Sequence, residues 1–110
     1  PEYNYQIPGG LKNLLDWLSR PTDEHDRTSP SAIRGKHAVI CGAAGKSAAA
    51  GMRKQLEALL GILGVEVLGG DGLGISLTPE SWQTDILTLE PGTQGMLDAL
   101  VDDTLRKLNH

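Results

Sequence analysis

The order of apolar segments along the chain constrains its fold more than any other feature. Residues 38–41 form an apolar run without polar alternation, which predicts a strand buried on both faces, as in a parallel sheet. An apolar stripe at helical spacing follows. Residues 65–68 then predict a second strand, which residues 74–77 continue after a glycine-rich bend. Strand and helix in alternation indicate an α/β fold with right-handed crossovers.

Three amphipathic helices are predicted, because leucine and other apolar residues recur at spacings of three and four. Pro8 and Pro21 bound the first helix, and Gly64 is placed to cap the end of the second. The apolar stripes consist of Leu11, Leu14, Leu15 and Leu18; of Met52, Leu56, Leu59, Leu60 and Leu63; and of Met96, Leu97, Leu100, Val101, Leu105 and Leu108. The charged residues expected to face away from the core are Arg53, Lys54 and Glu57, with the pairs Lys12–Asp16, Asp102–Arg106 and Asp103–Lys107.

The segments between these elements are long and polar. Residues 19–36 and 78–93 contain proline and are expected to form loops. Two strands are too few for a stable doubly wound sheet, so we expect further strands before Pro1. Residues 1–110 are therefore interpreted as the C-terminal portion of a single domain.

Composition limits the partners of this chain. The net charge of −4 argues against nucleic acid, which binds to basic surfaces. No apolar run approaches the roughly 20 residues that span a membrane, and no signal peptide is visible. The single cysteine, Cys41, permits no internal disulfide, which agrees with a reducing cytoplasm. We expect Cys41 to be a buried core thiol.

The first 20 residues read PEYNYQIPGGLKNLLDWLSR. This segment resembles the pattern P-E-Y-N-x-x-I-P-G-x-L-K-N-x-x-D-W-x-S-R, the hallmark of the NADPH-dependent FMN reductases. That family includes quinone, chromate and azo-dye reductases. The resemblance implies a flavodoxin-like, doubly wound parallel sheet, of which this chain would hold the third helix and the fourth and fifth strands with their helices.

The same resemblance implies where the flavin binds. A loop of proline, tyrosine and asparagine can present backbone N–H groups to the polar edge of a flavin ring. Ligands of open α/β sheets also bind at the carboxyl ends of the strands. The implied flavin-site residues are Pro1, Glu2, Tyr3, Asn4 and Tyr5 in the first loop, and Gly42, Ala43, Ala44 and Gly45 after the fourth strand. The family has a G-A-S-G-G-like stretch at this second place. Here Ala44 replaces the serine and Lys46 replaces the second glycine.

The activity implied is hydride transfer from NAD(P)H, through bound FMN, to a quinone, chromate, an azo compound or free flavin. No side chain of the chain is then needed as a catalytic acid or nucleophile, because the cofactor carries the chemistry. The resemblance places the FMN phosphate on a loop after the first strand, upstream of Pro1. It also implies a homodimer or homotetramer, and the helix of residues 11–18, with Trp17 on its flank, is the expected contact.

Two other functions compete with this interpretation. Residues 42–47 read GAAGKS between a strand and a helix, as in a P-loop nucleotide-binding protein. A P-loop has four residues between its glycines, but Gly42 is only three positions before Gly45, and only Asp71 is available to hold a magnesium ion. A non-catalytic interaction module that uses the helix of residues 11–18 is the other alternative. Residues 23–26 are expected to form a solvated loop, and no metal site is predicted.

Overall fold

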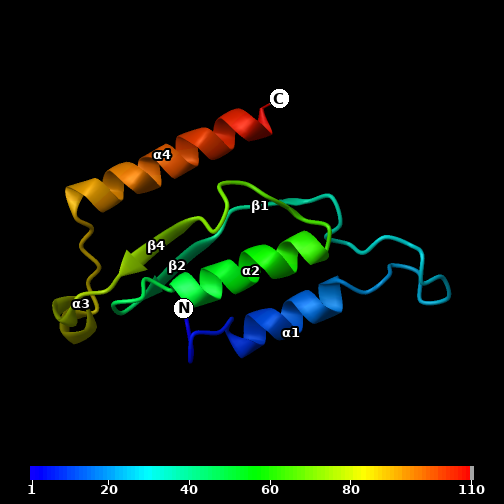
Figure 1. Ribbon diagram of the computed structural model, residues 1–110, viewed down its shortest axis with the longest axis horizontal. Coiled ribbons are helices and arrows are strands. Elements are labelled where there is room, and N and C mark those ends of the chain that lie inside the picture. Colours follow the sequence, from blue (N-terminus) through cyan, green and yellow to red (C-terminus); the bar gives the residue numbers. More distant parts are fainter. Residues whose placement is uncertain (110) are drawn as a thin grey trace.

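The computed structural model describes residues 1–109, in which helices flank two pairs of parallel strands (Figure 1). In chain order the elements are α1 Gly9–Leu18, β1 His37–Ala38, β2 Cys41–Ala44, α2 Ala50–Ile62, β3 Glu66–Val67, β4 Leu73–Ser76, α3 Pro79–Thr84 and α4 Pro91–Leu108. In Figure 1, α1 and α2 lie on one side of the strands and α4 lies on the other. The loop between α1 and β1 extends away from the body of the molecule.

Both strand pairs are parallel, as the sequence predicts. His37 of β1 lies opposite Glu66 of β3, and Cys41 of β2 lies opposite Leu73 of β4. The segment from Glu66 to Leu73 is therefore three residues longer than the segment from His37 to Cys41. The glycine-rich bend between β3 and β4 holds these extra residues. It also interrupts the predicted strand of residues 38–41, since β1 ends at Ala38 and β2 begins at Cys41.

The core lies between α2 and the strands. Met52, Leu56 and Leu60 of α2 are buried and belong to one cluster with Ile40, which is 2% exposed. Removing a side chain of this size from water stabilises the fold by about 1.5–3 kcal/mol. Gly64, with a φ of 81°, follows α2 in the left-handed conformation that the predicted C-terminal cap requires.

Burial on both faces, predicted for residues 38–41 from their apolar sequence, is wrong in this structure. Val39 and Cys41 are exposed, whereas Ile40 and Gly42 between and beside them are buried. This alternation arises because α2 covers one face of β2, while α4 reaches β4. Cys41 points to the open face, so its prediction as a buried core thiol is also wrong.

The helices differ from prediction in two details. In α1 only Leu15 of the apolar stripe is buried, and Trp17 is 70% exposed. Arg106 in α4 pairs with Asp103 at 3.3 Å rather than with Asp102. The predicted pairs Lys12–Asp16 and Asp103–Lys107 are confirmed, at 2.7 and 3.0 Å. Among residues 1–109, no helix has both the length and the apolar character needed to cross a bilayer.

The segment 78–93, predicted as a loop, contains α3 and the start of α4. Thr78 caps α3, because its Oγ1 accepts a hydrogen bond from the Ser81 N–H at 3.2 Å. Pro79 occupies the first turn, where its missing N–H is tolerated, and Glu80 is favoured by the helix dipole there. Threonine, proline and glutamate in this order are a helix-start signal that the prediction missed.

Candidate functional site

The N-terminal turn is closed by two backbone hydrogen bonds between Tyr3 and Gln6, at 2.9 and 3.4 Å. Asn4 and Tyr5, the central residues, have φ angles of 53° and 63°. Positive φ at both central residues is typical of a type I′ turn, which asparagine tolerates well and tyrosine does not. Such strain persists only where neighbouring contacts hold the turn in place.

Glu2 provides the most direct of these contacts, because its carboxylate caps α2. Its Oε2 accepts a hydrogen bond from the Met52 N–H at 2.9 Å, and its Oε1 accepts one from the Ser47 hydroxyl at 2.7 Å. Ala49, at the N-cap position, has no side-chain oxygen to do this. The hydrogen bond from the Met52 N–H, followed by that from Ser47, holds the pKa of Glu2 below its ordinary value.

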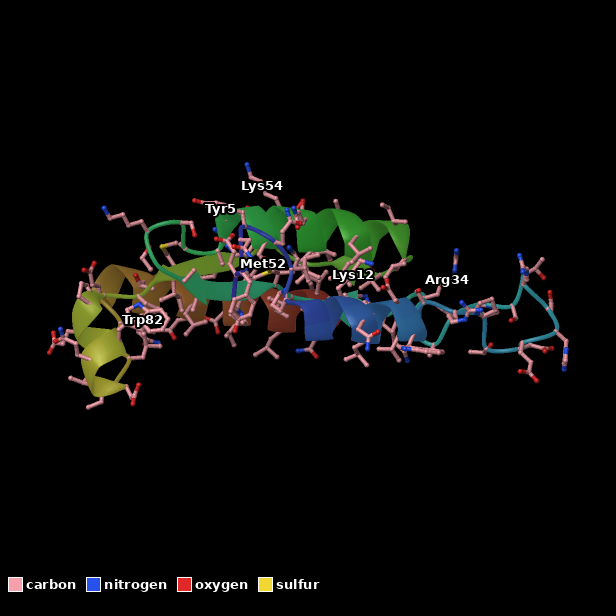
Figure 2. All side chains as sticks on the ribbon, turned by 90° about the horizontal axis from the view of Figure 1, so that it is seen from below. Tyr5, Lys12, Arg34, Met52, Lys54 and Trp82 are labelled. Atoms are coloured by element: carbon pink, nitrogen blue, oxygen red, sulfur yellow. The ribbon has the colours of Figure 1, made fainter. Side chains whose placement is uncertain are left out.

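The turn and the start of α2 are in close contact. A Cβ added at Gly51 would lie 3.0 Å from the Tyr5 carbonyl oxygen and 3.2 Å from Glu2 Oε2. Glycine at position 51 therefore lets the N-terminal turn approach the helix backbone. Figure 2 shows Tyr5 beside the start of α2, close to Met52.

Residues 45–49 connect β2 to α2 and are strained in the same way. Ala48 and Ala49 have φ angles of 50° and 59°, a left-handed conformation that alanine disfavours. Gly45 is the first residue of the loop, and a Cβ added there would meet no other side chain or backbone within 4 Å. In the part of the chain that the structure describes, the N–H groups of Asn4, Tyr5, Lys46 and Ser47 donate to no protein acceptor. Two adjacent loops thus offer free backbone donors to a ligand.

The predicted site residues are brought together only in part. Pro1, Tyr3, Asn4, Tyr5 and Gly45 are exposed at this edge. Ala43 and Ala44 lie in β2 and are half-buried. Gly42 is covered by α2, since an added Cβ would lie 2.7 Å from the Ala49 Cβ. The carboxylate of Glu2 caps α2 and is therefore already occupied by a hydrogen bond. Contact of these residues with a flavin stays a prediction.

Arg53 was predicted to face away from the core, and this is wrong. Its side chain is 12% exposed, and its Nε donates to the Ala48 carbonyl oxygen at 3.1 Å. Position 53 lies four residues after Ala49 and three before Leu56, both buried, so helical geometry places it on the buried face. Because arginine is charged, the prediction did not include position 53 in the apolar stripe of this helix.

The P-loop alternative loses support from the structure. Gly42, Ala43 and Ala44 belong to β2 rather than to a phosphate-binding loop. The carboxylate of Asp71, the acid considered for a magnesium ion, lies 3.5 Å from Arg53 Nη1.

We expect Glu2→Gln to destabilise the N-terminal turn and the start of α2 at neutral pH. The folded-state pKa of Glu2 is below 4.5, so its ionised form contributes stability that is fully present above that pH. This contribution is lost as the pH falls through the lowered pKa. Thermal unfolding of the wild type and the variant should therefore differ most at neutral pH and converge in acid. The exposed Glu24→Gln serves as control, and a difference that is independent of pH would contradict the prediction.

The structure is that of an α/β protein in which two strained loops meet at the carboxyl end of a parallel strand, the place where open α/β sheets bind their ligands. The family model described as NADPH-dependent FMN reductase matches residues 1–79. The chain belongs to the NADPH-dependent FMN reductase family, which implies the flavodoxin-like α/β fold.

Known relatives agree with this assignment. A quinone reductase of Escherichia coli strain K12 is 48% identical over 44 residues, which cover 40% of this chain and 23% of the relative. An NAD(P)H-dependent FMN reductase of Pseudomonas aeruginosa is 48% identical over 44 residues, 40% of this chain and 24% of the relative. An NAD(P)H:quinone oxidoreductase of Solanum tuberosum is 71% identical over 21 residues, 19% and 11% of the two chains. The matched segments span less than a quarter of the length of these relatives.

Proposed function

We propose that this chain forms part of an NAD(P)H-dependent FMN reductase whose flavin ring lies against residues 3–5 and 45–47. One observation carries the proposal: Glu2 joins two strained loops at the carboxyl end of β2, and both loops hold free N–H donors. A flavin ring has hydrogen-bond acceptors along its edge, so this donor set fits it. Family membership supports the same ligand.

Bound FMN would supply the redox chemistry, accepting a hydride from NAD(P)H and passing electrons to an acceptor. The chain itself would bind and orient the ring. The exposed side chains of Tyr3 and Tyr5 offer apolar surface beside it, and the N–H groups of Lys46 and Ser47 fix its polar edge. The names of the relatives favour a quinone or free flavin as acceptor, and we extend the proposal to chromate and azo compounds.

Self-association is part of the proposal. Leu14 and Trp17 of α1 are exposed, which supports this helix as the contact in a homodimer or homotetramer. We also propose a cytoplasmic location, because Cys41 is an exposed free thiol that an oxidising compartment would modify.

The test is to purify the full-length protein and record its absorbance, its affinity for FMN and its oxidation of NAD(P)H with a quinone. We expect flavin bands and quinone-dependent oxidation. Asn4→Ala should weaken FMN binding about fivefold, because alanine tolerates the left-handed conformation less well. Lys46→Ala should keep its activity, since no phosphate chain depends on it. A colourless protein that binds no FMN would refute the proposal, and nucleotide hydrolysis that Lys46→Ala abolishes would favour a P-loop function.

A further inference from the structure

We propose that Arg53 is a positioning residue, which holds residues 45–49 in the conformation that the flavin edge requires. This inference rests on the proposed function and adds to it a partly buried arginine that neither the sequence motif nor the family assignment singles out. Arg53 contacts the loop through the Ala48 carbonyl oxygen and would act through that peptide.

The paired strands β2 and β4 leave space for the side chain of Arg53. Gly42 of β2 and Gly74 of β4 lie directly opposite each other in the parallel register. A Cβ at Gly42 would lie 3.2 Å from Arg53 Cγ, and a Cβ at Gly74 would lie 2.6 Å from Arg53 Nη2. The side chain of Arg53 therefore crosses both strands over a pair of residues that have no side chains of their own.

The guanidinium group of Arg53 joins two segments of backbone. Its Nε donates to the Ala48 carbonyl oxygen at 3.1 Å, and its Nη1 donates to the carbonyl oxygens of Asp71 and Gly72 at 3.2 and 3.4 Å. The Asp71 carboxylate, 3.5 Å from Nη1, balances the charge. A planar group with several fixed donors can reach all of these oxygens at once, whereas a lysine ammonium is a single point charge.

The hydrogen bond to Ala48 has a specific consequence for the loop. Ala48 and Ala49 hold left-handed φ angles of 50° and 59°, so the loop needs an outside contact to stay in this form. Arg53 supplies it at the Ala48 carbonyl. The free N–H groups of Lys46 and Ser47 immediately precede this peptide, so their positions depend on it. Loss of Arg53 should release the loop, and glycine at position 48 should lower the need for Arg53.

The experiment compares Arg53→Gln, Arg53→Lys, Ala48→Gly and the double variants in the full-length protein, by FMN titration and thermal unfolding. Lys54→Gln is the matched control, because Lys54 points away from the body of the molecule in Figure 2. Arg53→Gln should weaken FMN binding about tenfold, the effect of losing hydrogen bonds to a charged group, and Arg53→Lys should weaken it less. Adding Ala48→Gly to Arg53→Gln should raise the affinity for FMN about fivefold above that of Arg53→Gln alone.

Two results would overturn the positioning role. The first is an Arg53→Gln variant whose affinity for FMN stays within about twofold of the wild type. The second is a loss that Ala48→Gly does not reduce, which would make Arg53 a structural residue only. If Arg53→Gln does not fold, Arg53→Lys with and without Ala48→Gly gives the same comparison. A wild-type protein that binds no FMN refutes the proposed function itself, and the role of Arg53 with it.

Discussion

Gly72→Ala is expected to destabilise the protein by at least about 3 kcal/mol, the range reached when a substitution forces the backbone to move. A Cβ at position 72 would overlap the Ile40 carbonyl oxygen and lie 2.7 Å from the Ile40 carbonyl carbon. Ile40 is in the core, and its carbonyl oxygen accepts the hydrogen bond from the Leu73 N–H at 3.1 Å. The clash therefore lies where β2 and β4 begin to pair. Neither the Gly72 backbone nor the Ile40 backbone can move away without breaking the hydrogen bond between Leu73 and Ile40.

Gly70→Ala separates the clash from the cost of the backbone conformation. Gly70 has a φ of 62°, close to the 72° of Gly72, but an added Cβ there would meet nothing nearer than Glu57 Oε2 at 3.6 Å. We expect Gly70→Ala to lower the free energy of unfolding by only about 1 kcal/mol, the strain of holding an alanine in the left-handed conformation. Denaturant unfolding of the full-length protein measures both variants. Equal losses would show that the contact with Ile40 is relieved by a small movement and would contradict the prediction.

The sequence was informative where structure depends on local spacing. The stripe of α2 and its cap at Gly64 follow from helical periodicity and from the freedom of glycine, and both are confirmed. Parallel pairing followed from the alternation of strands and helices. The break between β1 and β2 could not be predicted in this way. It depends on the extra residues in the bend near Gly72, which connects the two partner strands β3 and β4.

The site shows the same division. The turn that the structure has at Asn4 agrees with the residue type, since asparagine favours positive φ, and could be foreseen from it. The capping of α2 by Glu2 could not, because Glu2 and Met52 are 50 positions apart in the sequence. Arg53 combines both cases. Its spacing from Ala49 and Leu56 is a local signal for the buried face, which its charge outweighed in the prediction. The space for its side chain depends on the missing side chains of Gly42 and Gly74, which only the pairing of β2 with β4 brings together.

Gly45→Leu should reduce FMN affinity about 100-fold or more while leaving the thermal stability of the flavin-free protein unchanged. Gly45 is exposed, its φ lies outside the left-handed region, and no atom comes within 4 Å of the Cβ that a substitution would add. The fold therefore has room for the leucine. If the flavin ring occupies that room, as we propose, the leucine and the ring compete for the same space, and affinity falls by steric exclusion rather than by unfolding.

Gly61→Leu provides the matched control, because Gly61 is also exposed and free of neighbours but lies at the other end of α2 from the proposed site. Gly61→Leu should unfold at or above the wild-type temperature, since leucine favours a helix more than glycine does. Gly45→Leu should unfold at the wild-type temperature, because position 45 makes no contact. Only Gly45→Leu should lose FMN in a titration of the full-length protein. Unchanged affinity in Gly45→Leu would mean that the ring lies away from residues 45–47. The free N–H groups of Lys46 and Ser47 would then face solvent, and the N-terminal turn alone would remain as a candidate edge for the flavin.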